Sequence, residues 1–175
     1  FEKVVRAVEE LVPRVEPAEP GLAYVPVAGA VRYYGGEELL ARKVQEAIPP
    51  GARVGVADGP FAARCAAERA DPDGRFIVED TSSFLESLGV EALAPGELTE
   101  TFRWLGITTL GELARLPREA VASRFGLEGL TAHRLATGED RSPRPRPIPV
   151  HHAVESSHHD EPLLAAEQVA FITRA

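Results

Sequence analysis

Two adjacent pairs of histidines, with an aspartate beside them, are the side chains of this sequence best suited to bind a metal ion. They lie in the stretch HHAVESSHHDE as His151, His152, His158, His159 and Asp160. Imidazole nitrogens and carboxylate oxygens bind zinc. On a strand, however, neighbouring side chains point to opposite faces, so adjacent histidines diverge. The spacing fits no compact set of ligands, and we therefore predict a surface strand here and no metal site.

Acidic pairs and the single cysteine are the other candidates for chemistry. Glu37 and Glu38 follow two glycines, and Asp58 and Asp80 follow short apolar runs. Carboxylates in such places are more typical of helix starts or of solvated surface than of catalytic pairs. Cys65 cannot form an internal disulfide and lies in an Ala-rich run. We expect a small buried thiol there, in a reducing compartment, and not a nucleophile.

Composition places the chain among folded proteins. It has 175 residues, of which 44% are hydrophobic, enough for one ordinary domain or two small ones. No run reaches the roughly 18 apolar residues of a membrane helix, and no signal-peptide pattern opens the sequence. We expect a cytoplasmic protein. The chain starts with Phe and contains no Met, which suggests an internal piece of a longer polypeptide.

The net charge of −8 argues against a nucleic-acid partner, but its distribution is uneven. Residues 1–100 hold 10 basic and 18 acidic side chains, whereas residues 101–149 hold 8 and 5. All the basic residues of that middle segment are Arg, which binds phosphate in bidentate fashion. The middle segment is therefore the part of the chain suited to a phosphate backbone.

The first 80 residues alternate helical and extended patterns. Apolar residues at helical spacing predict a helix over residues 1–12, and alternation predicts a strand over residues 19–29 with Pro26 at an edge or bulge. The order then continues as helix 35–48, strand 52–58, helix 61–70 and strand 75–79. Such alternation is typical of an α/β or α+β layer.

The character changes near residue 80. Ser83 with Glu86, and Thr109 with Glu112, each match the capping box of a helix start. Pro117 suits a first helical position, so short helices are predicted over residues 80–138. The alternating prolines of EDRSPRPRPIP favour an extended linker. The last 26 residues offer a strand and the start of a helix.

Several of these stretches resemble Y-family DNA polymerases. The runs LGITTLGELARLP and RFGLEGLTAHRLATGED are similar to the family's thumb, VGVADGPFAARCAAERADPDG to a palm segment, and EPGLAYVPVAG to the palm strand SIDEAYLDVTG. The resemblance implies an α+β fold: a partial palm with a mixed or antiparallel sheet, and a small helical thumb of helix–hairpin–helix character. It assigns residues 1–80 to the palm, 81–140 to the thumb, 141–150 to a linker and 151–175 to the start of the little finger.

The departures from that pattern concern phosphoryl transfer. In register, the family's metal-binding Asp and Glu fall on Gly21 and Leu22, and two of its lysines fall on Pro60 and Asp71, while a third is kept only as Arg64. Carboxylates hold the two Mg²⁺ ions of such a reaction, and glycine and leucine cannot. The prediction is a palm without catalytic residues, without a metal site and without a cofactor.

A Y-family-like chain that lacks the metal-binding carboxylates is similar to the ImuB group of bacterial Y-family homologues. The resemblance implies a non-catalytic adaptor, and so not an enzyme, in damage-induced (SOS) translesion DNA synthesis and mutagenesis. Its expected partners are DNA, which it would hold weakly, a sliding clamp, a RecA-like companion protein and an error-prone C-family polymerase. The three proteins are expected to bind mostly through regions outside these residues. No membrane is involved, and a nucleoid-associated location follows.

Two alternatives stay open. The first is an active Y-family polymerase whose carboxylates lie in another register, with Glu16 or Glu19 as candidates. The second is a protein-interaction module with no role on DNA, which the net charge favours.

The candidate DNA contacts lie in the middle segment. The FGLEG turn, with Arg124, Gly126 and Gly129, could present backbone N–H groups to a phosphate, or could be only a helix end followed by a helix start. Arg144 and Arg146 could follow a phosphate track, lie in a solvated linker, or form a Pro-rich ligand. The residues in place of the family's first hairpin glycines, Leu93 to Pro95, predict a weakened grip there, although Gly96 could act one position later. Tyr33 and Tyr34 are predicted to pack against the palm sheet, with base stacking as the alternative.

Overall fold

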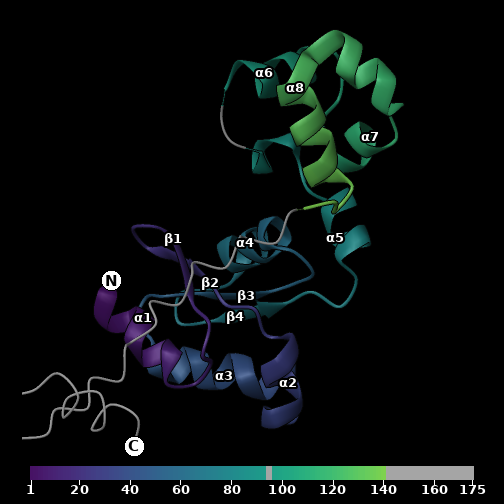
Figure 1. The fold of residues 1–175 in the computed structure, drawn as a ribbon. Helices are drawn as coiled ribbons and strands as arrows, with labels where there is room; N and C mark the ends of the chain where they lie inside the picture. Colours follow the sequence, from purple (N-terminus) through teal and green to yellow (C-terminus); the bar gives the residue numbers. More distant parts are fainter. Residues whose placement is uncertain (94–95, 141–175) are drawn as a thin grey trace, which may run out of the picture.

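The structure is a computed structural model that describes residues 1–93 and 96–140. Over these residues the chain is an α+β protein with two lobes, as Figure 1 shows. The mixed lobe, residues 1–80, contains strands and helices, and the helical lobe, residues 81–140, contains helices without strands among its described residues. The predicted fold class is confirmed. Arg144, Arg146, the linker and the histidine pairs lie outside the described residues.

The N-terminal half of the mixed lobe is a hairpin between helices. Helix α1 (Glu2–Glu9) precedes strands β1 (Glu16–Glu19) and β2 (Leu22–Tyr24), which pair antiparallel with an irregularity between Pro17 and Glu19. Helices α2 (Ala28–Tyr34) and α3 (Glu37–Ala47) follow. A small apolar cluster holds these elements together; its members are Val5, Val8, Val15, Ala23, Val25, Val44 and Ile48.

The sequence pattern overestimated the strand in this region. The predicted strand over residues 19–29 contains a turn at Gly21, whose φ is +95°, and only Leu22–Tyr24 of it pairs with β1. Pro26 lies between β2 and α2 because it has no N–H to continue a ladder. The predicted burial of Tyr33 is wrong, since its side chain is 84% exposed, while the hydroxyl of Tyr34 donates to the carbonyl of Leu11.

The second half of the mixed lobe is a parallel strand–helix–strand unit. Strand β3 (Val54–Val56) pairs in parallel with β4 (Arg75–Ile77), and helix α4 (Pro60–Arg69) connects them. Helix and strand approach closely at Gly55, where a Cβ atom would stand 2.1 Å from the carbonyl oxygen of Ala63. Only glycine permits this approach, so α4 is seated tightly on the sheet.

The helical lobe is built from short helices, as predicted. They are α5 (Thr81–Glu86), the 3₁₀ turn η1 (Val90–Ala92), α6 (Glu97–Trp104), α7 (Leu110–Ala114) and the long α8 (Arg118–Ala136). The capping box of Thr109 and Glu112 is confirmed at the start of α7. The other predicted box is wrong: Asp80 is the N-cap of α5, and its carboxylate accepts from the N–H of Ser82 and the hydroxyl of Ser83.

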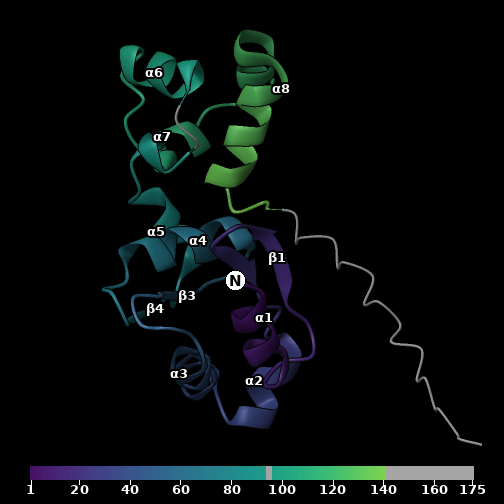
Figure 2. The same cartoon turned by 90° about the vertical axis from the view of Figure 1, so that its left-hand side faces the viewer.

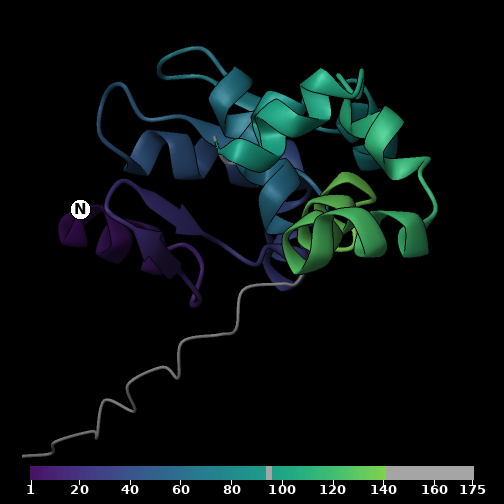
Figure 3. The ribbon, with the colours of Figure 1, turned by 90° about the horizontal axis from the view of Figure 1, so that it is seen from above.

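One apolar core joins the two lobes. It contains Phe61, Ala62 and Cys65 from α4, together with residues of the helical lobe: Leu85, Leu88, Val90, Leu93, Phe102, Leu110, Leu113, Ala132 and Ala136. Figure 2 shows α4 directly beneath α8 and beside α5. Seen from above in Figure 3, α1 lies at one end of the molecule, away from α8. None of the described helices has the length and apolarity needed to cross a membrane.

Candidate nucleic-acid interface

A sharp bend in α8 is the structural feature behind the FGLEG motif. Gly126 adopts φ 62° and ψ −147° in the middle of the helix, which therefore stops and starts again. That backbone conformation is open to glycine and strained for other residues. Gly126 is exposed, and a Cβ there would meet no atom within 4 Å. Both readings of the motif are compatible with this geometry, because a helix that restarts presents its first N–H groups outward.

Gly129 lies on the buried side of α8 and leaves space for the bend. It is buried, and a Cβ on it would stand 2.3 Å from the Cβ of Phe125. In an undisturbed helix residues four apart have Cβ atoms about 5–6 Å apart. The bend at Gly126 therefore closes this distance, and Gly129 makes room for it. Of the two predicted glycines, one lies at the surface and the other is a packing residue.

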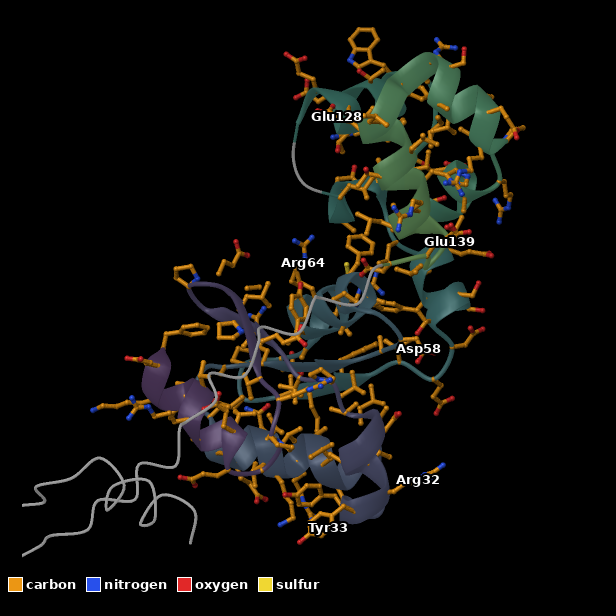
Figure 4. The ribbon with its side chains drawn as sticks, viewed as in Figure 1. Arg32, Tyr33, Asp58, Arg64, Glu128 and Glu139 are labelled. Carbon is orange, nitrogen blue, oxygen red and sulfur yellow. The ribbon has the colours of Figure 1, made fainter. Side chains whose placement is uncertain are left out.

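Arg124 supplies positive charge next to the bend. Its side chain is exposed, its guanidinium carbon lies 5.8 Å from the ring centroid of Phe125, and no ion pair found in the described ranges involves it. Glu128 is exposed on the other side of the bend and opposes an approaching anion. Figure 4 shows Glu128 at the top of the helical lobe, far from Arg32 and Tyr33 at the bottom of the mixed lobe.

The first hairpin offers less to a phosphate. Leu93 is 6% exposed and belongs to the apolar core, so its side chain faces inward. Residues 94 and 95 lie outside the described residues. Gly96 is the N-cap of α6 without a side-chain cap, and its φ of 170° is ordinary extended backbone. This part of the predicted interface rests on Gly96 alone.

The four positions predicted to have lost catalytic groups are dispersed over turns and a helix start. Gly21 forms the β1–β2 turn at φ +95°, and Leu22 begins β2 and is half-buried. Pro60 opens α4 at a position that favours proline, and Asp71 is exposed after that helix. None of these side chains can hold a divalent cation except Asp71, and a single carboxylate does not make such a site.

The two alternative carboxylates do not assemble a metal site either. Glu16 is 7% exposed and its Oε2 has no hydrogen-bond partner, whereas Glu19 is exposed. Throughout residues 1–93 and 96–140, no three His, Cys, Asp or Glu side chains are close enough to hold an ion. The described residues therefore do not fit a pair of Mg²⁺ ions.

Arg64 is bound to the protein itself. Its Nη2 donates to the carbonyl of Ala92 at 3.1 Å, and its Nε lies 3.5 Å from a carboxylate oxygen of Glu68. Burial raises the pKa of Tyr24, and the nearby charge of Arg64 partly offsets this effect. No local pattern indicated that Arg64 would contact η1, because Ala92 is 28 residues away along the chain.

Cys65 is confirmed as a buried thiol. It is 3% exposed, and burial raises its pKa, with the charge of Glu68 acting in the same direction. A thiol that resists ionisation is a poor nucleophile.

Homologous proteins identify the superfamily. The chain is 32% identical over 151 residues to a DNA polymerase IV of Dehalococcoides mccartyi (strain CBDB1), a match that covers 81% of this chain and 38% of that protein. It is 36% identical over 135 residues to a DNA polymerase IV of Methanoculleus marisnigri, with 73% and 37% covered. These matches support the DinB/UmuC-like superfamily for this chain. No protein-family model matches it.

Solved structures share the fold. The chain superimposes on the crystal structure of DinB from Sulfolobus solfataricus with a TM-score of 0.67 and 21% identity, covering 81% of this chain and 45% of that one. An insertion ternary complex of Dbh DNA polymerase gives a TM-score of 0.68 at 21% identity, with 81% and 44% covered. The chain thus spans under two fifths of the length of the curated relatives described above.

The prediction that the protein is not an enzyme is contradicted. The relatives that match most of this chain are named DNA polymerase IV, which points to enzyme activity. The prediction took the missing carboxylates at Gly21 and Leu22 as decisive. The chain spans only 38% of the length of one such relative, so two missing carboxylates on one strand do not decide the activity of a whole polymerase. The narrower resemblance to the ImuB group stays a prediction.

Proposed function

We propose that the whole protein containing this chain is a Y-family DNA polymerase that acts in translesion DNA synthesis. The observation that carries the proposal is the match to DNA polymerase IV over 81% of the chain. In this proposal residues 1–80 are the later part of the palm and residues 81–140 are the thumb. The predicted linker 141–150 and little-finger start 151–175 complete the assignment.

The thumb's part would be to hold the DNA backbone. Backbone N–H groups at the Gly126 bend and the guanidinium of Arg124 are donors suited to phosphate oxygens. Such contacts position the duplex without reading its sequence, which suits an enzyme that copies varied templates. This attraction is local to the bend, because residues 81–140 as a whole hold five basic and nine acidic side chains.

The chemistry of nucleotide addition would need carboxylates that the described residues do not bring together. Two Mg²⁺ ions held by acidic side chains supply charge neutralisation and activation in phosphoryl transfer. Gly21 and Leu22 do not fit that role, and we assign no step to them. We propose that this chain contributes the frame and the DNA grip.

The predicted protein partners and location remain part of the proposal. The resemblance implies a sliding clamp, a RecA-like companion protein and a C-family polymerase, with a role in the SOS response and a cytoplasmic, nucleoid-associated location. These partners would bind regions outside the described residues.

Primer extension tests the enzymatic part. The full-length protein is incubated with primer–template DNA, nucleotides and Mg²⁺ or Mn²⁺, and nucleotide incorporation above background is expected. An intact preparation that binds the same DNA but adds no nucleotide with either metal would refute it.

A matched pair of arginine variants tests the DNA grip. Arg124→Ala removes an exposed arginine next to the bend, whereas Arg32→Ala removes an exposed arginine on α2 in the other lobe. Loss of one phosphate contact should lower the slope of log affinity against log salt by about 0.9. We expect this change for Arg124→Ala and not for Arg32→Ala; equal slopes in both variants would remove Arg124 from the interface.

A further inference from the structure

The N-terminus of α4 lacks a cap of its own. Its N-cap residue is Gly59, which has no side chain to accept a hydrogen bond, and Pro60 follows at the first helical position. The acceptor comes from the other lobe: the Oδ2 of Asp140 receives the N–H of Phe61 at 2.5 Å, across 79 residues of sequence. A carboxylate in this place satisfies a helix donor and lies favourably in the helix dipole.

Both sides of the contact are shaped for it. Gly59 has φ +92°, and a Cβ on it would stand 3.3 Å from the Cβ of Asp140, so a larger residue would crowd the carboxylate. On the other side, the chain turns after α8 at Gly138, whose φ is +74°, and the N–H of Glu139 donates to the carbonyl of Arg134 at 2.8 Å. The end of the helical lobe therefore holds Asp140 in place.

Helix α4 is fixed to both lobes. On the mixed lobe it packs against β3 at Gly55, as described above. Toward the helical lobe it contributes Phe61 and Cys65 to the shared core, and Arg64 donates to the carbonyl of Ala92. Apolar packing is not directional, whereas hydrogen bonds constrain distance and angle. The hydrogen bonds of Asp140 and Arg64, together with the one that the N–H of Asp58 donates to the hydroxyl of Thr81 at 3.1 Å, are thus the parts of this junction that can set an orientation.

We propose that Asp140 is a positioning residue: by capping α4 from the helical lobe, it sets the orientation of that lobe, and of the Gly126 bend, relative to the β3–β4 sheet. Figure 4 shows the neighbouring Glu139 at the lower end of the helical lobe, where it meets the mixed lobe. The consequence for DNA rests on the proposed function. The capping contact and the orientation do not.

Hydrogen exchange tests the cap. Asp140→Ala should accelerate exchange of the Phe61 amide by roughly fivefold or more, because this amide loses its acceptor. Asp140→Asn keeps an acceptor oxygen without the charge and should give a smaller acceleration. Glu139→Ala is the matched control: it removes a neighbouring carboxylate that pairs with Arg118 at 3.7 Å, and should leave Phe61 unchanged.

Distances between spin labels test the orientation. Labels at Arg32→Cys and Ser123→Cys lie on exposed positions of the two lobes, and the buried Cys65 stays unmodified. The distribution of distances in the full-length protein should broaden or shift in Asp140→Ala and return toward that of the parent in Asp140→Asn. A mere loss of stability would not move the distances within the folded molecules.

Three outcomes separate the possibilities. If Asp140→Ala leaves the distance distribution unchanged, the inference is overturned, whether or not the exchange of the Phe61 amide accelerates. If Asp140→Ala does not fold, the exchange rate of the Phe61 amide in Asp140→Asn decides the question. A rate equal to that of the parent overturns the inference. Weaker binding of primer–template DNA by Asp140→Ala than by Glu139→Ala supports the link to DNA, whereas an absence of DNA binding by the parent counts against the proposed function and leaves the cap standing.

Discussion

A methyl group added at Gly129 should oppose the bend that exposes Gly126. In Gly129→Ala the new carbon would stand 2.3 Å from the Cβ of Phe125 and 3.2 Å from Cγ1 of Val121. Carbon atoms in contact normally lie about 3.5–4.0 Å apart, so one half of α8 must move by more than about 1 Å. The ring of Phe125 cannot retreat freely, because it stacks edge-to-face on the fully buried Phe102 with centroids 5.0 Å apart.

The size of the effect follows from two opposing terms. Overpacking in a well-packed core costs up to about 3 kcal/mol, and here the obstacle is a carbon attached directly to the backbone. Replacing Gly by Ala in a helix returns about 1 kcal/mol. The expected net destabilisation is about 2 kcal/mol, which corresponds to a fall in Tm of roughly 4–8 °C for a domain of this size.

Gly29→Ala is the matched control for this experiment. Gly29 is a glycine of helix α2, it is exposed, and a Cβ on it would meet nothing within 4 Å. Its replacement should leave Tm unchanged or raise it by about 2 °C, since only the helix term remains. Thermal unfolding of the two variants and the parent, followed by circular dichroism, measures the difference. If Gly129→Ala is as stable as Gly29→Ala, the close contact at Phe125 is not what shapes the bend.

Three further predictions concern the helical lobe and its junction. The N–H groups of Thr108 and Thr109 donate to the carboxylate of Glu112 and hold its pKa below its ordinary value. The stabilisation is present above the pKa of the unfolded state and is lost as pH falls through the pKa of the folded state, so urea midpoints should depend less on pH below pH 5 in Glu112→Gln. Cys65, whose pKa is raised by burial, should resist alkylation at pH 8 in the folded protein and react promptly in urea; fast labelling of the native protein would contradict its burial. Phe102→Ala should lower the free energy of unfolding by about 3–5 kcal/mol, whereas Trp104→Ala, at a side chain 91% exposed, should change it by about 0.5 kcal/mol or less in urea titrations.

Local patterns predicted much of the fold. The apolar spacing in α3 and the Ala-rich run of α4 gave both helices, and Thr109 with Glu112 gave the start of α7, because these signals act between residues three or four apart. The same kind of reasoning failed at residues 27–29, which the alternation assigns to the strand over residues 19–29. The chain has already left the sheet there, and α2 begins at Ala28.

The candidate site was also predicted only in part from the sequence. The glycines of FGLEG predicted an interruption in the helix. The excess of arginines in residues 101–149 pointed to that segment, but it comes from Arg141, Arg144 and Arg146, because residues 101–140 hold five basic and five acidic side chains. The burial of Gly129 could not be predicted from sequence, because it depends on how close the side chain of Phe125 comes to Gly129 when the helix bends. The prediction about enzyme activity failed for another reason: a missing pair of carboxylates describes one strand, and this chain matches only 38% of the length of a relative named DNA polymerase IV.

By itself the sequence determined most of the helical segments apart from α2, where the chain must bend, and which positions carry no carboxylate, since these depend on side-chain chemistry and near neighbours. Only the tertiary structure decided that α4 belongs to both lobes and that Asp140 caps it. The physical reason is distance along the chain. A hydrogen bond across 79 residues leaves no periodicity in the sequence, and it exists only after packing has brought the two lobes together.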